Sequence, residues 1–250
     1  MPTIAVFNQR IGVGKTTTAL NLLAAIAQRG ERPWGIDLHP DAELSRTFGV
    51  DGHGRQESMS AFFTNEAPLT HVAHVTKSGI VLCPGHAELR ELDRSLGKSF
   101  AAVTRLRRGV REPGTATGPV IIDCPATLGS LTLNAIFASD LVLVPVCDDD
   151  AVQAAIAVDR ALNALSRAVR RPLARRYVLT RCGDGVAQVV DRLGRAVNAA
   201  DILPTRIAER AELAESPAYG LDVFRHAPDS PGAQHYQALL DDLVSAGKLG

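Results

Sequence analysis

Residues 3–18 read TIAVFNQRIGVGKTTT, an apolar run followed by a turn with two glycines and then by a helical pattern. Gly12 and Gly14 allow a tight turn whose backbone N–H groups point inward, and the helix that follows adds its positive N-terminal end. Lys15 can reach the β- and γ-phosphates of a nucleotide, and the Thr16 hydroxyl can bind Mg²⁺. The stretch therefore predicts a phosphate-binding loop between a strand and a helix.

The predicted nucleotide contacts are consecutive residues of this loop: Ile11, Gly12, Val13, Gly14, Lys15, Thr16 and Thr17. A strict Walker A pattern requires a glycine five residues before Gly14, and Gln9 stands at that position. The strict pattern fails, but a GxGKT turn between a strand and a helix still indicates a phosphate site.

Two acidic residues follow apolar runs elsewhere in the chain. Asp123 ends the run VIID at 120–123 and is the predicted partner of Thr16 in holding Mg²⁺. Asp37 ends the run at 33–38 and is expected at the same edge, because ligands gather at the carboxyl ends of parallel strands. Taken alone, Asp37 also fits a turn or a helix cap.

Short β-branched runs alternate with longer helical patterns along the whole chain. This alternation predicts an α/β fold in which residues 1–250 form a single P-loop domain, with a mostly parallel twisted sheet flanked by helices. The expected strands are 3–7, 33–38, 79–83, 119–123, 141–146 and 177–180, and the expected helices are 16–29, 151–169, 186–199 and 232–246. Residues 109–118 are expected to form an exposed loop.

The composition limits the class of protein. The chain has 250 residues, 46% of them hydrophobic, and 27 basic side chains balance 27 acidic ones, which excludes a uniformly basic nucleic-acid coat. No apolar run approaches the ~20 residues that cross a bilayer, and no basic leader of a secretory signal is present. Cys83, Cys124, Cys147 and Cys182 form no CxxC pair and are expected to be reduced core residues of a cytosolic protein.

Together these motifs resemble the ParA/MinD family of deviant-Walker P-loop ATPases, and most of all ParA-type partition proteins. Residues 10–17 align with the family loop KGGVGKTT, residues 37–41 with DxDPQ, and residues 121–135 with IIDxPPSLGxLTxNA. Residues 140–146 and 213–236 resemble a further strand and the C-terminal segment of the family, so the resemblance runs nearly from end to end.

The resemblance implies an ATPase that binds ATP with Mg²⁺, forms a homodimer on ATP and binds DNA non-specifically. It implies slow hydrolysis, stimulated by a ParB-like or other adaptor protein, and a cytoplasmic, nucleoid-associated protein that positions or segregates a cargo of DNA or protein. It does not imply a membrane partner.

The resemblance also implies catalytic roles for Arg10, Lys15, Asp37 and His39. Arg10 stands at the position of the signature lysine, which in the family reaches across the dimer, and a guanidinium keeps that charge. His39 stands where the family has a second aspartate that supports hydrolysis, and an imidazole does not replace a carboxylate beside Mg²⁺. Ile11 replaces a glycine. The alternative function is a nucleotide-gated binding module with little or no hydrolysis.

Positive charge is concentrated in two stretches. Seven arginines and no acid lie between residues 160 and 181, and five arginines with Lys98 lie between 94 and 111. Such stretches predict a basic surface that suits phosphate backbones without reading bases. The candidate DNA contacts are Arg170, Arg171, Arg206 and Arg210, and for Arg206 and Arg210 the adenine side of the nucleotide is the alternative location. The alternative is that these arginines only solvate helix surfaces.

Two relatives of different function are disfavoured. A membrane-surface ATPase of the MinD type requires a C-terminal amphipathic helix with a basic polar face, whereas the polar face of residues 235–243 is acidic. An iron–sulphur protein of the nitrogenase type requires cysteines placed around a cluster, and Cys124 directly follows Asp123 instead.

Overall fold

The computed structural model describes residues 2–50, 54–97 and 99–247. Its centre is an eight-stranded sheet with the strand order β3-β4-β2-β5-β1-β6-β7-β8. The strands are β1 (Thr3–Val6), β2 (Trp34–Asp37), β3 (His74–Val75), β4 (Val81–Cys83), β5 (Val120–Asp123), β6 (Leu141–Val146), β7 (Arg175–Cys182) and β8 (Ile202–Ala208). β3 pairs with β4 in the antiparallel sense, and the other pairs are parallel. The predicted mostly parallel sheet is confirmed.

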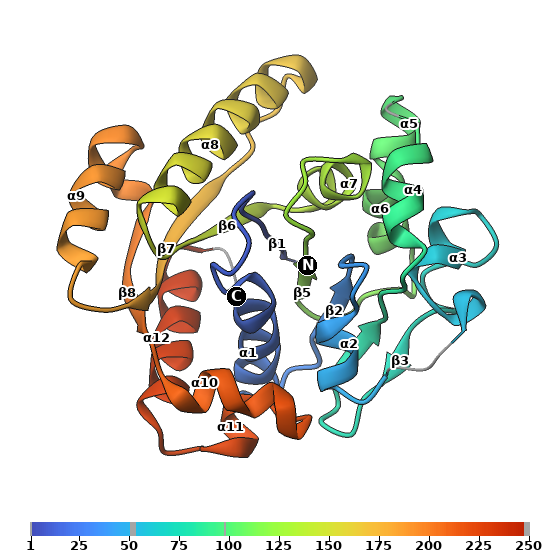
Figure 1. The fold of residues 1–250 in the computed structure, drawn as a ribbon. Helices are drawn as coiled ribbons and strands as arrows, with labels where there is room; N and C mark the ends of the chain where they lie inside the picture. The colour runs from blue at the N-terminus through green and yellow to red at the C-terminus, as the bar shows by residue number, and fades with distance from the viewer. Residues whose placement is uncertain (1, 51–53, 98, 248–250) are drawn as a thin grey trace.

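Helices cover both faces of this sheet (Figure 1). They are α1 (Lys15–Gln28), α2 (Glu43–Thr47), α3 (Met59–Phe63), α4 (Leu89–Ser95), α5 (Phe100–Val103), α6 (Arg105–Arg111), α7 (Ser130–Ala138), α8 (Asp149–Val169), α9 (Val186–Ala196), α10 (Ala211–Glu215), α11 (Val223–His226) and α12 (Pro231–Ser245). Short 3-10 turns lie at Arg55–Glu57, Ala199–Asp201 and Ser216–Tyr219. Among the described residues, no helix is long and apolar enough to span a membrane.

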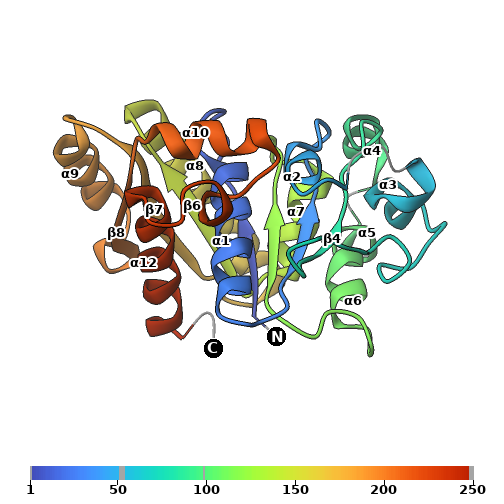
Figure 2. The ribbon, with the colours of Figure 1, turned by 90° about the horizontal axis from the view of Figure 1, so that it is seen from below.

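The alternation of side chains in β1 shows how the two cores form. Ile4 and Val6 belong to a core shared with α1 and α12, whereas Ala5 and Phe7 belong to a core shared with α7 and α8. Each strand side chain is buried on its own face, as in a parallel sheet covered on both sides. Figure 2 shows α9 and α12 at one end of the molecule and α3, α5 and α6 at the other. Because β1 lies between β5 and β6 in the strand order, the phosphate loop between β1 and α1 starts from the middle of the sheet.

All six predicted strands are present, and β6 has the predicted bounds. β3 and β8 were not predicted. β3 has two residues, and β8 is an edge strand in which buried and partly exposed residues are mixed, so neither gives an apolar run. The four predicted helices correspond to α1, α8, α9 and α12, while the remaining helices, most of them short, were not predicted.

Two predictions require correction. The expected loop at 109–118 is wrong at its start, because α6 continues to Arg111 and Gly109 packs against the Phe62 ring. Thr115 and Ala116 in the same stretch are buried, so the loop is not fully exposed. All four cysteines are free, as expected, but only Cys83 and Cys124 are core residues, and the other two are half-buried.

Candidate nucleotide site

The phosphate loop has the backbone conformation that its two glycines allow. Gly12 has φ +79° and Gly14 has φ +82°, in the left-handed region where other residues are strained. Gly14 is the N-cap of α1, and its carbonyl accepts the N–H of Thr18 at 2.8 Å. The turn therefore leads directly into the N-terminus of α1, where free N–H groups favour an anion.

Buried side chains hold this loop from two neighbouring strands. The Asn8 amide donates to the Pro145 carbonyl in β6 at 2.7 Å, and its oxygen accepts the Arg10 N–H at 3.0 Å. The Thr180 hydroxyl in β7 donates to the Val13 carbonyl at 2.9 Å. The loop is thus tied to β6 and β7 as well as to its own strand.

Lys15 lies within the loop and is almost fully buried. Its ammonium donates to the Arg10 carbonyl at 2.9 Å, five residues back along the chain. Burial lowers the pKa of Lys15, and the charge of Asp123 opposes that change. A buried cation with a single hydrogen-bond acceptor retains donors for an anionic ligand.

Thr16 and Asp123 form the other polar pair of the site. The Thr16 hydroxyl donates to Asp123 Oδ2 at 2.8 Å, while the buried Oδ1 has no hydrogen-bond partner among the residues that the structure describes. Burial raises the pKa of Asp123 well above its usual range, and the nearby Asp37 adds to the rise. A buried carboxylate oxygen without a partner is unstable unless a cation or a proton reaches it. This donor set of a hydroxyl and a carboxylate fits Mg²⁺.

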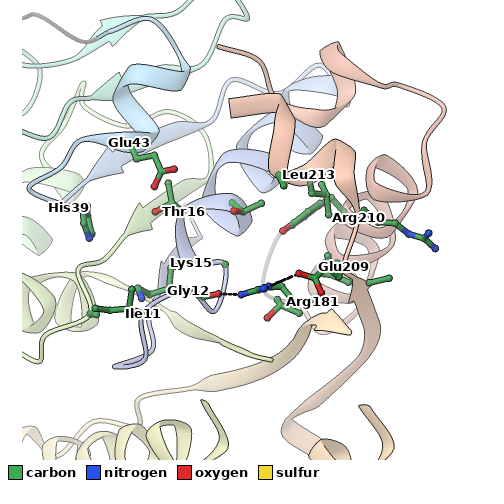
Figure 3. Close-up of a pocket in the computed structure, with 18 of the residues that line it drawn as sticks. Ile11, Gly12, Lys15, Thr16, His39, Glu43, Arg181, Glu209, Arg210 and Leu213 are labelled. Carbon is green, nitrogen blue, oxygen red and sulfur yellow. Dashed lines mark hydrogen bonds and ion pairs between the residues drawn. The ribbon is translucent and has the colours of Figure 1, made fainter. Parts of the chain in front are cut away.

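A pocket of about 470 Å³ opens above these residues (Figure 3). Three segments form most of its lining: the phosphate loop, the turn between β2 and α2, and the ends of β7 and β8 with α10. Ala126 after β5 and Tyr236 on α12 complete it. Seven of the predicted loop and catalytic residues line the pocket: Ile11, Gly12, Gly14, Lys15, Thr16, Thr17 and His39. Val13 is buried under the loop, and Arg10 is not part of the lining.

Asp37 is wholly buried beneath the pocket and fully engaged. Its carboxylate accepts the His39 N–H at 3.0 Å, the Ser45 N–H at 3.0 Å and the Ser45 hydroxyl at 2.6 Å. These bonds fix the turn between β2 and α2. Gly85 lies against the same carboxylate, where an added Cβ would lie 3.1 Å from Asp37 Oδ1. The contacts are those of the turn-forming role that the sequence left open.

Arg10 and His39, the two unusual residues of the motifs, both point to nearby aspartates. Arg10 Nη2 lies 3.2 Å from Asp150 Oδ2 at the start of α8, and both side chains are largely exposed. His39 Nδ1 accepts the Asp41 N–H at 3.3 Å and lies 3.7 Å from Asp41 Oδ2. Figure 3 shows His39 at the margin of the pocket.

The sequence motifs did not reveal the lining residues that come from other segments. Arg181, at the end of β7, donates to the Gly12 carbonyl at 3.1 Å and pairs with Glu209 at 2.9 Å. Its φ is +50°, although it is not a glycine. Glu43 begins α2 and also lines the pocket. The one signal for these residues in the sequence was their place after predicted strands, because the carboxyl ends of parallel strands meet at one edge of the sheet.

The four candidate DNA contacts lie at two edges of the sheet. Arg170 and Arg171 follow α8 and precede the start of β7, whereas Arg206 and Arg210 lie near and beyond the end of the parallel strand β8. Arg210 lines the nucleotide pocket. Lys98 lies outside the described residues.

Several arginines of the two basic stretches are neutralised by acids from outside those stretches. Arg175 pairs with Asp159, Arg176 with Asp201, Arg181 with Glu209 and Arg111 with Asp140. Arg171 is half-buried and donates to the Phe137 carbonyl at 3.2 Å. The stretches are therefore less basic in space than in sequence.

Comparison with known proteins identifies the family. A family model described as an AAA domain matches residues 1–173. The chromosome-partitioning ATPase Soj of Thermus thermophilus is 32% identical over 246 residues, which cover 97% of this chain and 95% of Soj. The chromosome partitioning protein ParA of Caulobacter vibrioides is 30% identical over 250 residues, which cover 97% of this chain and 93% of ParA.

Solved structures confirm the fold. Apo McdA of Cyanothece superposes with a TM-score of 0.86 at 17% identity, covering 97% of this chain and 99% of McdA. The septum site-determining protein MinD of Pyrococcus horikoshii, complexed with Mg-ADP, has a TM-score of 0.73 at 20% identity, covering 99% of this chain and 98% of MinD. The chain therefore belongs to the family of P-loop ATPases that includes Soj and ParA.

Proposed function

We propose that this ATPase positions or segregates a cargo, either DNA or a protein assembly, by dimerising on ATP and binding DNA without sequence preference. Residues 1–250 act as one ATPase domain, and an adaptor protein of the ParB-like kind stimulates slow hydrolysis. The observation that carries the proposal is the phosphate loop with its buried Lys15 and its Thr16–Asp123 pair under the pocket. The partitioning function named for Soj and ParA, at about 30% identity over nearly the whole chain, supports it.

The roles in nucleotide binding follow from the contacts. Lys15 neutralises the β- and γ-phosphates, and the loop N–H groups from residue 11 to residue 17 bind their oxygens. Thr16 and Asp123 hold Mg²⁺, which when bound neutralises charge on the transferred phosphoryl group. Asp37 keeps the turn beside this site in place through its three hydrogen bonds.

Arg10 and Ile11 are the proposed dimer contacts. Ile11 is 80% exposed beside the pocket, a large apolar side chain that a partner subunit would cover. Arg10 is held by Asp150 in an exposed ion pair, which is worth little because water competes for both charges. Its guanidinium is thus free to turn to the nucleotide of the partner subunit at low cost.

The proposed DNA surface has its strongest support on α8. Arg160, Arg167 and Arg170 are exposed, and in the part of the chain that the structure describes their guanidinium groups have no ion pair. Residues 160 and 167 are two helical turns apart and share one face. Arg171, Arg206 and Arg210 remain candidate contacts, with Arg171 restricted by its bond to Phe137.

The alternative function is a nucleotide-gated module with little or no hydrolysis. The His39 side chain favours it, because its Nδ1 faces Asp41 and it offers no carboxylate to the pocket. Phosphate release in the presence of ATP, with and without DNA, separates the two functions. A working ATPase releases phosphate continuously, and a gated module releases none above the background.

The proposed function is tested by DNA binding at controlled nucleotide state. We expect unrelated duplexes to bind with equal affinity in ATP and Mg²⁺, weakly in ADP, and with a steep decrease as salt rises. A wide spread of affinities between duplexes at one salt concentration, or no effect of ATP, would contradict the proposal.

A further inference from the structure

Glu43 is the first residue of α2 and borders the nucleotide pocket. Its backbone is fixed, because its carbonyl accepts the Thr47 hydroxyl at 2.9 Å. Figure 3 shows its carboxylate pointing toward Thr16. Within the described residues, that carboxylate has no hydrogen bond or ion pair.

Glu43 faces the pair of Thr16 and Asp123, in which one carboxylate oxygen lacks a hydrogen bond within the described residues. The Thr16 hydroxyl donates to one oxygen of Asp123, and in residues 2–50, 54–97 and 99–247 the other oxygen of this wholly buried carboxylate has no partner. Asp123 and Glu43 are thus both directed to Thr16. Two carboxylates near one hydroxyl repel each other unless a cation lies between or beside them.

The neighbouring acids are already engaged. Asp37 accepts three hydrogen bonds from the turn, and Asp41 pairs with Arg90 at 2.8 Å. His39 offers a ring nitrogen to the Asp41 N–H. Of the acids in residues 37–43, all of which the structure describes, Glu43 is therefore the one whose oxygens are directed to the pocket without a partner.

We propose that Glu43 is a further carboxylate of the Mg²⁺ site, which orders the water bound to the ion and supplies the negative charge that His39 lacks. Mg²⁺ in proteins keeps several waters and is bound through one or two carboxylates. An outer carboxylate therefore accepts hydrogen bonds from the waters on the ion. Such outer partners change metal affinity by about 10- to 100-fold when they are removed. This inference rests on the proposed function, because it requires that ATP binds with Mg²⁺ at Thr16 and Asp123.

The test compares ATP binding by calorimetry in excess Mg²⁺ and in EDTA, without any measurement of turnover. In the unmodified chain we expect Mg²⁺ to strengthen ATP binding. Glu43→Gln should not weaken ATP binding in EDTA, because it removes a negative charge beside the phosphates, and it should lower the affinity in excess Mg²⁺ by roughly tenfold. Glu31→Gln, at an exposed glutamate before β2, is the matched control and should behave as the unmodified chain.

A second variant tests the link to His39. His39→Asp combined with Glu43→Gln should recover most of the lost Mg²⁺ effect, because a carboxylate returns to the same end of the pocket. Mn²⁺ bound with ATP, followed by electron paramagnetic resonance, should show weaker ion binding in Glu43→Gln and recovery in the double variant.

Each outcome has a separate meaning. If Glu43→Gln keeps the full Mg²⁺ effect, or loses affinity equally in EDTA, the assignment of Glu43 is wrong while the nucleotide site stands. If the unmodified chain binds ATP with no effect of Mg²⁺, or does not bind ATP, the proposed function fails as well.

Discussion

The phosphate loop and residues 39–43 both border the nucleotide pocket, but different kinds of contact hold them. Buried hydrogen bonds to two other strands fix the loop. The Asn8 amide donates to the Pro145 carbonyl in β6, and the Thr180 hydroxyl in β7 donates to the Val13 carbonyl. In residues 39–43 the backbone is fixed through the buried Asp37 carboxylate, but the side chains make exposed contacts, such as the Asp41–Arg90 pair and the short-range bond between His39 and Asp41. Exposed pairs of this kind contribute about 0–1 kcal/mol, whereas buried hydrogen bonds are costly to break.

This difference separates nucleotide binding from turnover. The loop is already shaped for phosphate before the nucleotide arrives, so little reorganisation is required for binding. In the turn that carries His39 and Glu43, the backbone is fixed by Asp37, but the His39 side chain contacts the exposed Asp41, and the turn differs from the family motif at His39. We therefore expect changes in the loop to remove most of the ATP binding, and changes at residues 39–43 to alter the rate and the contribution of Mg²⁺ while ATP binding persists.

The largest effect is expected from Lys15→Ala. Removal of a buried cation that faces phosphate should weaken ATP binding by about 2–5 kcal/mol, which is roughly 30-fold or more. Calorimetry with ATP and Mg²⁺ measures the loss, and Lys77→Ala, at an exposed lysine after β3, serves as the control. Unchanged ATP affinity in Lys15→Ala would show that the loop is not the nucleotide site.

The next effect is expected from Arg10→Ala, which should abolish the ATP-dependent dimer while the monomer still binds ATP. Arg10 lies outside the pocket lining, so its removal leaves the ATP site of its own subunit intact. The dimer should be lost because the exposed Arg10 guanidinium, paired with Asp150 at the surface, is the proposed contact to the partner subunit. Light scattering after gel filtration in ATP measures the dimer. A variant that still dimerises on ATP would remove the cross-dimer role.

Asp150→Ala is the matched change on the other side of that ion pair. Release of Arg10 should strengthen the ATP-dependent dimer slightly, by up to about 1 kcal/mol. Weaker dimerisation in Asp150→Ala would mean that Asp150 contributes to the interface directly.

A smaller, additive effect on DNA binding is expected from the exposed arginines at the C-terminal end of α8. Arg170→Glu together with Arg167→Glu should weaken binding to all duplexes by a similar factor. Each lost phosphate contact should also reduce, by about one, the slope of the logarithm of the binding constant against the logarithm of the salt concentration. Arg192→Glu together with Arg195→Glu on α9 makes the same net change of charge at exposed arginines that are paired with acids, and should have less effect. Equal losses in the two double variants would point to net charge, and not to the arginines at the end of α8, as the determinant.

The smallest effect on ATP binding and dimerisation is expected from His39→Asp. A carboxylate at this position should raise steady-state phosphate release by a few-fold up to about tenfold, because part of the missing charge is already supplied by Glu43. ATP affinity and dimerisation should stay within about twofold of the unmodified chain. No gain in turnover would show that His39 does not limit the rate.

The sequence predicted the parts of the molecule in which local pattern and chemistry coincide. The run from β1 through the glycine turn into α1 was predicted because its residues act within one short segment, and Asp123 was predicted because it ends an apolar strand. β8 was missed because partly exposed edge residues give no continuous apolar run.

Residues that act across the fold were beyond reach of the sequence. The bond from Arg181 to Gly12 joins positions 169 residues apart, and the two bonds from Ser45 to Asp37 depend on how α2 folds back over β2. The basic stretches looked more exposed than they are, because acids such as Asp159 and Asp201 lie outside them in sequence. Pairing of this kind is fixed by topology and not by spacing.

Sedimentation velocity of the unmodified chain in three nucleotide states tests the central claim most directly. The phosphate loop with its buried Lys15 and exposed Arg10 should give a monomer without nucleotide, a monomer with ADP, and a dimer with ATP and Mg²⁺. A chain that binds ATP and Mg²⁺ yet sediments as the same species in all three states would contradict the account.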